Sequence, residues 1–180
     1  IELVDDKIIT DHEGLYTSGG ANSYWNLLVY LVEKFTTRAM AIRMSKYFEV
    51  EIDRVSQSQF MIFKGNKTHQ DEIILNVQDY IENHYREKLT ISQLAEQAHL
   101  APRTLQRRFK KATHYPLGEY IQRVRVEAAK KEFEKGNKII NEVKYQAGYN
   151  DSKAFRKVFK KYTGLTPVEY QDKYDKLSLW

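Results

Sequence analysis

The chain has 180 residues, 42% of them hydrophobic and 29% charged, with a net charge of +5 at neutral pH. This length suits one domain of ordinary size or two small ones. The lack of cysteine excludes disulfides, thiolate nucleophiles and cysteine-ligated zinc, and it fits a cytoplasmic location. No apolar run approaches the roughly 18 residues needed to span a bilayer, so no membrane partner is expected. The chain begins at Ile1 without a signal-like leader, and we interpret it as a piece of a longer protein.

Charge is unevenly distributed along the chain. Residues 1–63 contain 6 Lys and Arg against 9 Asp and Glu, whereas residues 64–180 contain 23 against 15. A basic part that follows a mildly acidic one indicates a polyanionic partner for the second part only. Surplus charge alone would fit an ordinary solvated lysine surface equally well.

Residues 1–63 predict a small α/β fragment. Short apolar runs at 1–4, 8–10 and 15–17, separated by turn-forming residues, predict two or three short strands. Apolar residues then recur at helical spacing, first from Trp25 to Phe35 and next from Met40 to Phe48. Two helices are therefore expected after the strands.

Some features of this fragment allow a second interpretation. Thr17–Gly20 lacks the Lys and Ser or Thr of a P-loop, so a plain strand-to-helix turn is favoured over a phosphate loop. A dimer or effector surface could be formed by Tyr24, Trp25, Tyr30, Phe35 and Met40, although helical spacing favours ordinary core for most of them. The five histidines, at positions 12, 69, 84, 99 and 114, have no metal-ligand spacing, and no cofactor or metal is expected.

The remainder of the chain is expected to be helical after a linker at 64–72. Apolar periodicity, glycines and prolines predict helices at 73–85, 90–98, 102–112, 117–133, 139–147, 152–162 and 167–174. Capping boxes begin two of them, at Thr90–Gln93 and Thr166–Glu169. The fold class is therefore mainly α, with seven helices in the segment 73–177.

Two segments of the helical part, 94–120 and 143–170, are similar to each other. At an offset of 49 residues, the matching pairs are Leu94 and Val143, Ala98 and Ala147, and Leu100 and Tyr149. At an offset of 50 residues, they are Leu105 and Phe155, Phe109 and Phe159, Lys110 and Lys160, Lys111 and Lys161, and Tyr120 and Tyr170. One added residue in the second turn explains the change of offset. Each copy has a short helix, a tight turn, a second helix and a basic run, as in a helix-turn-helix unit.

The outward faces of the two second helices favour DNA as the partner. At about 100° per residue, the face opposite Leu105 carries Arg103, Gln106, Arg107 and Lys110, and the face opposite Phe155 carries Lys153, Arg156, Lys157 and Lys160. Ordinary solvated faces would mix Glu with Lys, whereas these faces lack acidic residues in both copies. The helix between the copies, taken as 117–135, is about 28 Å long, and successive major grooves lie about 34 Å apart. One chain could therefore hold two recognition helices in adjacent grooves.

The residues of this part resemble AraC/XylS-type transcription regulators. FRKVFKKYTGLTPVEYQ at 155–171, preceded by Ala147-Gly148-Tyr149, resembles the signature of that family, and LAEQAHLAPRTLQRRFKKATHYPLGEYI at 94–121 resembles its first helix-turn-helix. The resemblance implies a seven-helix domain with two helix-turn-helix units joined by a long linker helix. It also implies double-stranded promoter DNA and RNA polymerase as partners, and no enzymatic activity.

The resemblance also implies which side chains contact DNA. Base contacts fall on Arg103, Gln106, Arg107, Lys153, Arg156 and Lys157, and phosphate contacts on Thr104, Lys110, Lys111, Ser152, Lys160 and Lys161. Ala101-Pro102 departs from the family pattern, because many members have a Ser or Thr there that can contact phosphate. The first recognition helix is therefore expected to use backbone N–H groups at its N-terminus.

The first 63 residues resemble the end of a PfpI-like, glutamine-amidotransferase-type domain. The resemblance lies in Gly14–Ala21, in the Leu27–Phe35 helix and in DRVSQSQF at 53–60. It implies a possible homodimer through the N-terminal domain. Residual PfpI-like catalysis is disfavoured because the chain has no cysteine nucleophile, and RNA binding because it lacks an aromatic-rich strand pair for base stacking.

Overall fold

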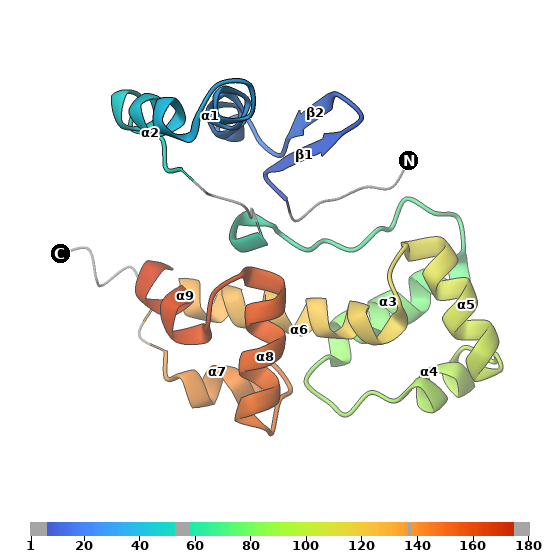
Figure 1. The fold of residues 1–180 in the computed structure, drawn as a ribbon. Coiled ribbons are helices and arrows are strands. Elements are labelled where there is room, and N and C mark those ends of the chain that lie inside the picture. The colour runs from blue at the N-terminus through green and yellow to red at the C-terminus, as the bar shows by residue number, and fades with distance from the viewer. Residues whose placement is uncertain (1–6, 53–57, 137, 175–180) are drawn as a thin grey trace. The chain divides into compact units, whose positions relative to one another are not determined.

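The computed structural model describes residues 7–52, 58–136 and 138–174, and the chain divides into two compact units between Met61 and Ile62. The described residues form nine α-helices, a short 3-10 helix (Ser58–Phe60) and a two-stranded sheet, so the protein is mainly helical (Figure 1). Seven of these helices, α3 to α9, lie in the second unit, and α1 and α2 lie in the first. None of the described helices is long and apolar enough to cross a membrane. The strand expected at 1–4 lies outside the described residues.

A β-hairpin begins the first unit. Strands β1 (Ile9–His12) and β2 (Leu15–Ser18) pair antiparallel, as the apolar runs predicted. Glu13 and Gly14 between them have φ of 50° and 83°. Two successive left-handed residues are what a type I′ turn requires, and this turn matches the twist of the paired strands. The chain then turns directly into a helix, which fits the strand-to-helix interpretation of the glycines at 19 and 20.

Helices α1 (Ser23–Phe35) and α2 (Arg38–Tyr47) complete the first unit as described. The expectation that most of the large apolar side chains from Tyr24 to Met40 form core is wrong: Trp25 is 43% exposed, Phe35 69% and Met40 50%. Among the described residues of this unit, the buried apolar side chains are those of Ile8, Val29 and Ala41. Helical spacing shows that side chains share a stripe, but it does not show whether another element covers that stripe.

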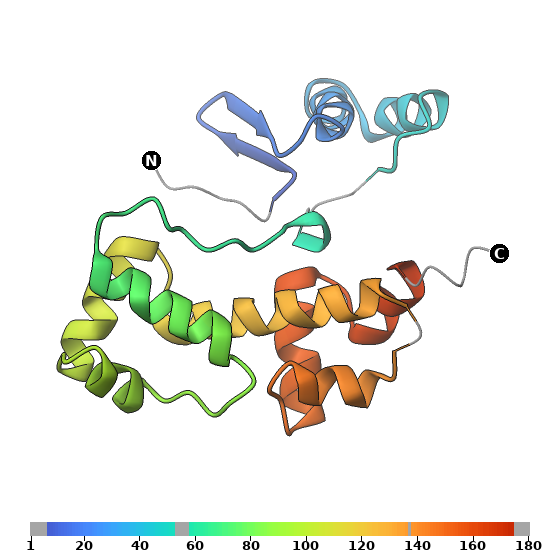
Figure 2. The same cartoon turned by 180° about the vertical axis from the view of Figure 1, so that it is seen from behind.

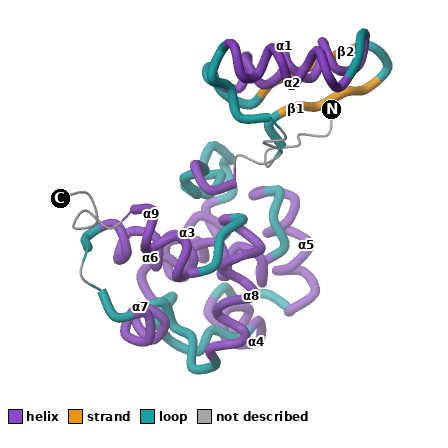
Figure 3. Tube along the Cα trace, turned by 60° about the vertical axis from the view of Figure 1, so that its left-hand side comes forward, coloured by secondary structure: helices purple, strands orange, loops and turns teal. Residues whose placement is uncertain are grey.

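The second unit is built around the long helix α6 (Leu117–Glu134), which runs from one group of helices to the other (Figure 2). One group consists of α3 (Glu72–His84), α4 (Ile91–Gln97) and α5 (Pro102–Thr113), and the other of α7 (Ile140–Gln146), α8 (Ser152–Thr163) and α9 (Pro167–Tyr174). The observed ends agree closely with the ends that periodicity and caps predicted. In the trace of Figure 3, the helices of this unit are purple and the described connections between them are teal.

Helix α6 belongs to two hydrophobic cores. Its first turns bury Leu117 and Tyr120 against α3, α4 and α5, and its later turns bury Ala129 and Phe133 against α7, α8 and α9. Each half of the unit therefore has its own apolar core, and the backbone of one helix joins the two cores.

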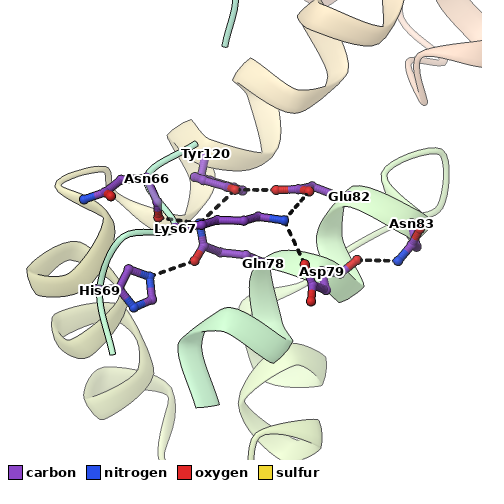
Figure 4. A network of polar contacts seen from close by, with 8 residues as sticks. All are labelled: Asn66, Lys67, His69, Gln78, Asp79, Glu82, Asn83 and Tyr120. Atoms are coloured by element: carbon purple, nitrogen blue, oxygen red, sulfur yellow. Dashed lines mark hydrogen bonds and ion pairs between the residues drawn. The ribbon is translucent and has the colours of Figure 1, made fainter. Parts of the chain in front are cut away.

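The segment before α3, expected to be a linker at 64–72, is held against the first half of the second unit (Figure 4). Gln78 of α3 has no solvent exposure, and its amide nitrogen donates to the Asn66 carbonyl at 3.0 Å and to the Tyr120 hydroxyl at 2.9 Å. The side-chain oxygen of Gln78 lies 2.8 Å from Nε2 of His69. The buried amide thus has partners on both its nitrogen and its oxygen.

Charged and small residues of the same segment add to this attachment. Lys67 donates to Asp79 at 2.8 Å and to Glu82 at 2.7 Å, and the Tyr120 hydroxyl donates to Glu82 at 2.6 Å. Gly65 has a φ of 65°, and a Cβ there would overlap the Tyr120 hydroxyl. The polar composition of this segment predicted a linker. Its attachment could not be foreseen, because the partners on α3 and α6 are distant in sequence.

Candidate nucleic-acid interface

The first helix-turn-helix unit consists of α4, a tight turn and α5. The expected capping box begins α4: Thr90 Oγ1 accepts from the Gln93 N–H at 3.3 Å, and Gln93 Oε1 accepts from the Thr90 N–H at 3.1 Å. In the turn, His99 has a φ of 52° and the Leu100 N–H donates to the Ala95 carbonyl at 2.9 Å. These bonds fix the direction in which α5 leaves the turn.

The second helix-turn-helix consists of α7, a turn and α8, and it has the same geometry. Gly148 has a φ of 79° at the position equivalent to His99, and the Tyr149 N–H donates to the Lys144 carbonyl at 3.0 Å. The connection between the helices is one residue longer than in the first unit, which is the insertion inferred from the change of offset. The internal repeat is therefore a repeat of structure as well as of sequence.

Helices α5 and α8 bury the same positions. Leu105, Phe109 and Thr113 are buried in α5, and Phe155, Phe159 and Thr163 are buried in α8. Each threonine hydroxyl donates to the carbonyl four residues earlier, at 2.8 Å in both helices. Both helices are thus held in the same rotational setting, which determines the side chains that face outward.

The outward face of each helix carries the residues assigned to DNA contact. In α5 the exposed residues are Arg103, Gln106, Arg107, Lys110 and Lys111, whereas Thr104 is half-buried; in α8, Ser152, Lys153, Arg156, Lys157, Lys160 and Lys161 are all exposed. None of these cations forms an ion pair with a carboxylate in the part of the chain that the structure describes. Their positive charge is therefore available to an external anion.

The N-termini of the two helices differ. Helix α5 begins with Pro102 and has no side-chain cap, whereas the Asp151 carboxylate at the start of α8 accepts from the Ala154 N–H at 2.6 Å. This cap occupies an N–H group that would otherwise be open to an anion. The backbone N–H groups of the first turn are consequently more open in α5 than in α8.

Two cations close to the interface have structural roles that the sequence did not reveal. Arg108, on the half-buried side of α5, donates to the Asp71 carboxylate at 2.5 Å. Burial opposes ionisation of Asp71, but Arg108 and the Ile74 N–H outweigh it and lower the pKa of this carboxyl. Lys144 of α7 is 5% exposed and donates to the Ser152 hydroxyl at 3.1 Å, which braces the start of α8. An i, i+4 pattern cannot identify such partners on other elements.

The length of α6 is comparable to the spacing of major grooves on one face of a DNA duplex. Its 18 residues span about 27 Å, compared with about 34 Å between successive major grooves on one face of B-DNA. The two repeated units, their cationic outward faces and this joining helix define a double helix-turn-helix DNA-binding domain.

Comparison with known proteins gives the family. A helix-turn-helix domain family matches residues 94–173. Bacillus subtilis AdaA, named a bifunctional transcriptional activator and DNA repair enzyme, is 40% identical over 95 residues, covering 53% of this chain and 45% of AdaA. The C-terminal domain of the response regulator yesN from Fusobacterium nucleatum is 30% identical with a TM-score of 0.54, covering 56% of this chain and 99% of that domain. The DNA-binding domain of AdpA, solved in complex with a target DNA, is 26% identical with a TM-score of 0.54, covering 56% of this chain and 91% of that one.

The second unit belongs to the AraC-type family of helix-turn-helix domains, the DNA-binding part of transcription regulators. The chain spans about half the length of the first curated relatives that it matches, 45% of AdaA and 58% of a regulator from Pseudoalteromonas carrageenovora.

Proposed function

We propose that this chain regulates transcription by binding double-stranded promoter DNA in a sequence-specific way, with α5 and α8 in two adjacent major-groove segments. The observation that carries the proposal is the repeated set of exposed cations on two equivalently packed helices at opposite ends of α6. Cationic side chains on such faces neutralise phosphates and release counterions, which makes affinity fall steeply with salt.

Different side chains on these faces are assigned different tasks. Arg103 and Arg107 suit bidentate contact with guanine and Gln106 suits adenine, each worth about 1–3 kcal/mol of discrimination between bases. In α8, the base contacts are assigned to Lys153, Arg156 and Lys157.

The remaining residues of the two faces are assigned to the DNA backbone. Thr104, Lys110, Lys111, Ser152, Lys160 and Lys161 are placed to contact phosphates. Such contacts position the protein on the duplex without specifying the sequence. At the start of α5, the uncapped backbone N–H groups add to them.

The decisive experiment is selection from a random duplex library at two salt concentrations, followed by the same selection with point variants. Arg107→Ala should relax preference at one or two base pairs, whereas Lys161→Ala should weaken all sequences alike and reduce the salt slope by about one. Lys46→Ala, an exposed cation of the first unit, is the matched control and should change neither property. An Arg107→Ala variant with an unchanged base preference at every position would contradict the assignment.

The first unit is proposed to be the end of a PfpI-like domain and to contribute to a homodimer. The exposed side chains of Trp25 and Phe35 are the kind of apolar surface that the rest of such a domain, or a second copy, would cover. Sedimentation of the intact protein tests the dimer, and the tryptophan fluorescence of a longer chain tests the covered surface.

Two further points concern the whole protein. RNA polymerase is the proposed protein partner at promoters, and a polymerase pull-down on promoter DNA with and without this protein tests it. A purely regulatory protein should also show no turnover, and assays of the intact protein for DNA repair, hydrolase and glyoxalase activity test that expectation.

A further inference from the structure

The two halves of the DNA-binding unit are joined by more than the backbone of α6. Arg125 of α6 donates from Nε to the Tyr85 carbonyl at 2.8 Å and from a terminal nitrogen to the Glu87 carbonyl at 2.7 Å, just beyond the end of α3. Its guanidinium carbon lies 5.4 Å from the ring centroid of Tyr149, in the turn of the second helix-turn-helix. Arg125 therefore connects the end of α3 in the first half to the turn before α8 in the second half.

Backbone contact supports this connection. A Cβ built on Gly148, next to Tyr149, would lie 2.6 Å from the Tyr85 carbonyl oxygen and 3.1 Å from Nε of Arg125. The second turn thus approaches the end of α3 so closely that only a glycine fits. Burial lowers the pKa of Arg125, yet an arginine stays charged at any physiological pH, so these charge-assisted bonds persist.

A second arginine connects the C-terminal ends of the two recognition helices. The guanidinium carbon of Arg123 lies 4.8 Å from the ring centroid of Tyr115, which follows α5, and 4.8 Å from that of Tyr162, near the end of α8. Glu119 accepts from Nε of Arg123 at 2.9 Å, and the Tyr162 hydroxyl donates to Gln122 of α6 at 3.0 Å. Cation–π contacts of this kind attract the guanidinium to both rings.

The two arginines act on opposite sides of α6. Residues two apart on a helix are separated by about 200° around its axis, so Arg123 and Arg125 bridge the halves on nearly opposite faces. Each half packs on α6 through its own core, and two tethers on opposite sides of α6 add restraint against movement of α5 relative to α8. Neither arginine is on the outward faces of α5 and α8.

We propose that Arg123 and Arg125 are positioning residues that fix the mutual setting of α5 and α8 and thereby determine the half-site spacing that the protein accepts. The proposal rests on the proposed reading of two adjacent grooves. Each inserted base pair moves one half-site by about 3.4 Å and turns it by about 35° around the duplex. A rigid pair of helices cannot follow both changes. The tethers therefore make the protein discriminate between operators whose half-sites are spaced differently.

The test uses the selected operator with zero, one or two base pairs inserted between its half-sites, and compares affinities at constant salt. For the natural protein we expect a loss of about tenfold or more for one inserted pair, comparable to one lost base contact. Arg123→Lys and Arg125→Lys keep the charge but lose the planar, forked guanidinium, and should reduce that loss to about threefold or less. The exposed Arg86 beside the junction supplies the control, and Arg86→Lys should keep the full penalty.

A measurement without DNA separates this inference from the proposed function. Because the chain has no cysteine, Glu96→Cys on α4 and Glu142→Cys on α7 allow spin labels at two exposed sites only. The distance distribution between the labels should be narrow in the natural background and broader with Arg123→Lys or Arg125→Lys. Unchanged distributions in both variants would overturn the proposal whatever the DNA results. A natural protein without any sequence preference would refute the proposed function instead.

Discussion

Gly148→Ala tests the contact between the two halves of the DNA-binding unit most directly. Gly148 has a φ of 79°, and a Cβ there would meet the Tyr85 carbonyl oxygen at 2.6 Å and the Cα of Arg86 at 3.1 Å. Both are backbone atoms, so no flexible side-chain end can move aside. The alanine methyl therefore has to push the second turn away from the end of α3.

Gly164 provides a control for the backbone cost alone. Its φ is 75°, and a Cβ there would meet nothing within 4 Å. A left-handed residue with a Cβ costs about 1–2 kcal/mol, and this cost applies to both substitutions. Overpacking at Gly148 adds about 1–3 kcal/mol, so Gly148→Ala should destabilise the protein by about 2–5 kcal/mol and Gly164→Ala by about 1–2 kcal/mol.

Urea unfolding of both variants, followed by circular dichroism, gives the two free energies. The comparison is meaningful because His99, a residue with a Cβ, occupies the equivalent position in the first turn at a φ of 52°. The left-handed conformation therefore does not by itself demand glycine, and the additional cost at Gly148 must come from the contact. Equal losses in the two variants would refute the reasoning about the junction.

Three further changes separate other contributions. Asp71→Asn should lower the unfolding free energy at pH 7, and the difference between the variant and the natural protein should shrink as pH falls below 3.8. The reason is that a carboxyl with a lowered pKa in the folded protein contributes stability above its unfolded-state pKa and loses that contribution when it is protonated. Urea titrations at pH 7 and pH 3 would show the change. Tyr120→Phe should lower the unfolding free energy by about 1–3 kcal/mol, because it leaves the fully buried amide of Gln78 short of a hydrogen-bond partner. Tyr170→Phe should lower it by about 1 kcal/mol, because the lost bond affects only the exposed Glu134. Thermal melts would rank the two variants. His114→Gly, at a φ of 66° where the second copy has Gly164, should stabilise the protein by about 0.5–1 kcal/mol, and an unchanged or lower melting temperature would contradict this.

Local sequence patterns were sufficient to predict the helices of the second unit. Contacts between elements distant in sequence could not be predicted and are known only from the structure. The helix ends and both capping boxes follow from residues within one or two turns, and the structure confirms them. The attachment of residues 65–69 does not follow from sequence, since it depends on Gln78 and Tyr120, which meet only through the packing of α3 on α6. The same limit explains the error over Trp25, because periodicity cannot show whether a stripe has a partner.

Some departures from the internal repeat lie at the junction between the halves. Many equivalent positions differ in residue type, and four such pairs concern the junction: His99 and Gly148, Leu100 and Tyr149, Ala112 and Tyr162, and Tyr115 and Leu165. In each pair, one member contacts the junction: Gly148 the end of α3, Tyr149 the guanidinium of Arg125, and Tyr115 and Tyr162 the guanidinium of Arg123.

At the junction, the four differing pairs supply contacts between the halves. The core positions Phe109 and Phe159, and the buried hydroxyls of Thr113 and Thr163, are the same in both copies because each half needs them for its own packing. The four pairs named above differ where one half contacts the other. The two helix-turn-helix units therefore share the packing of these core positions but differ in their contacts with α6 and the end of α3, and we expect these contacts to set the position of α5 relative to α8.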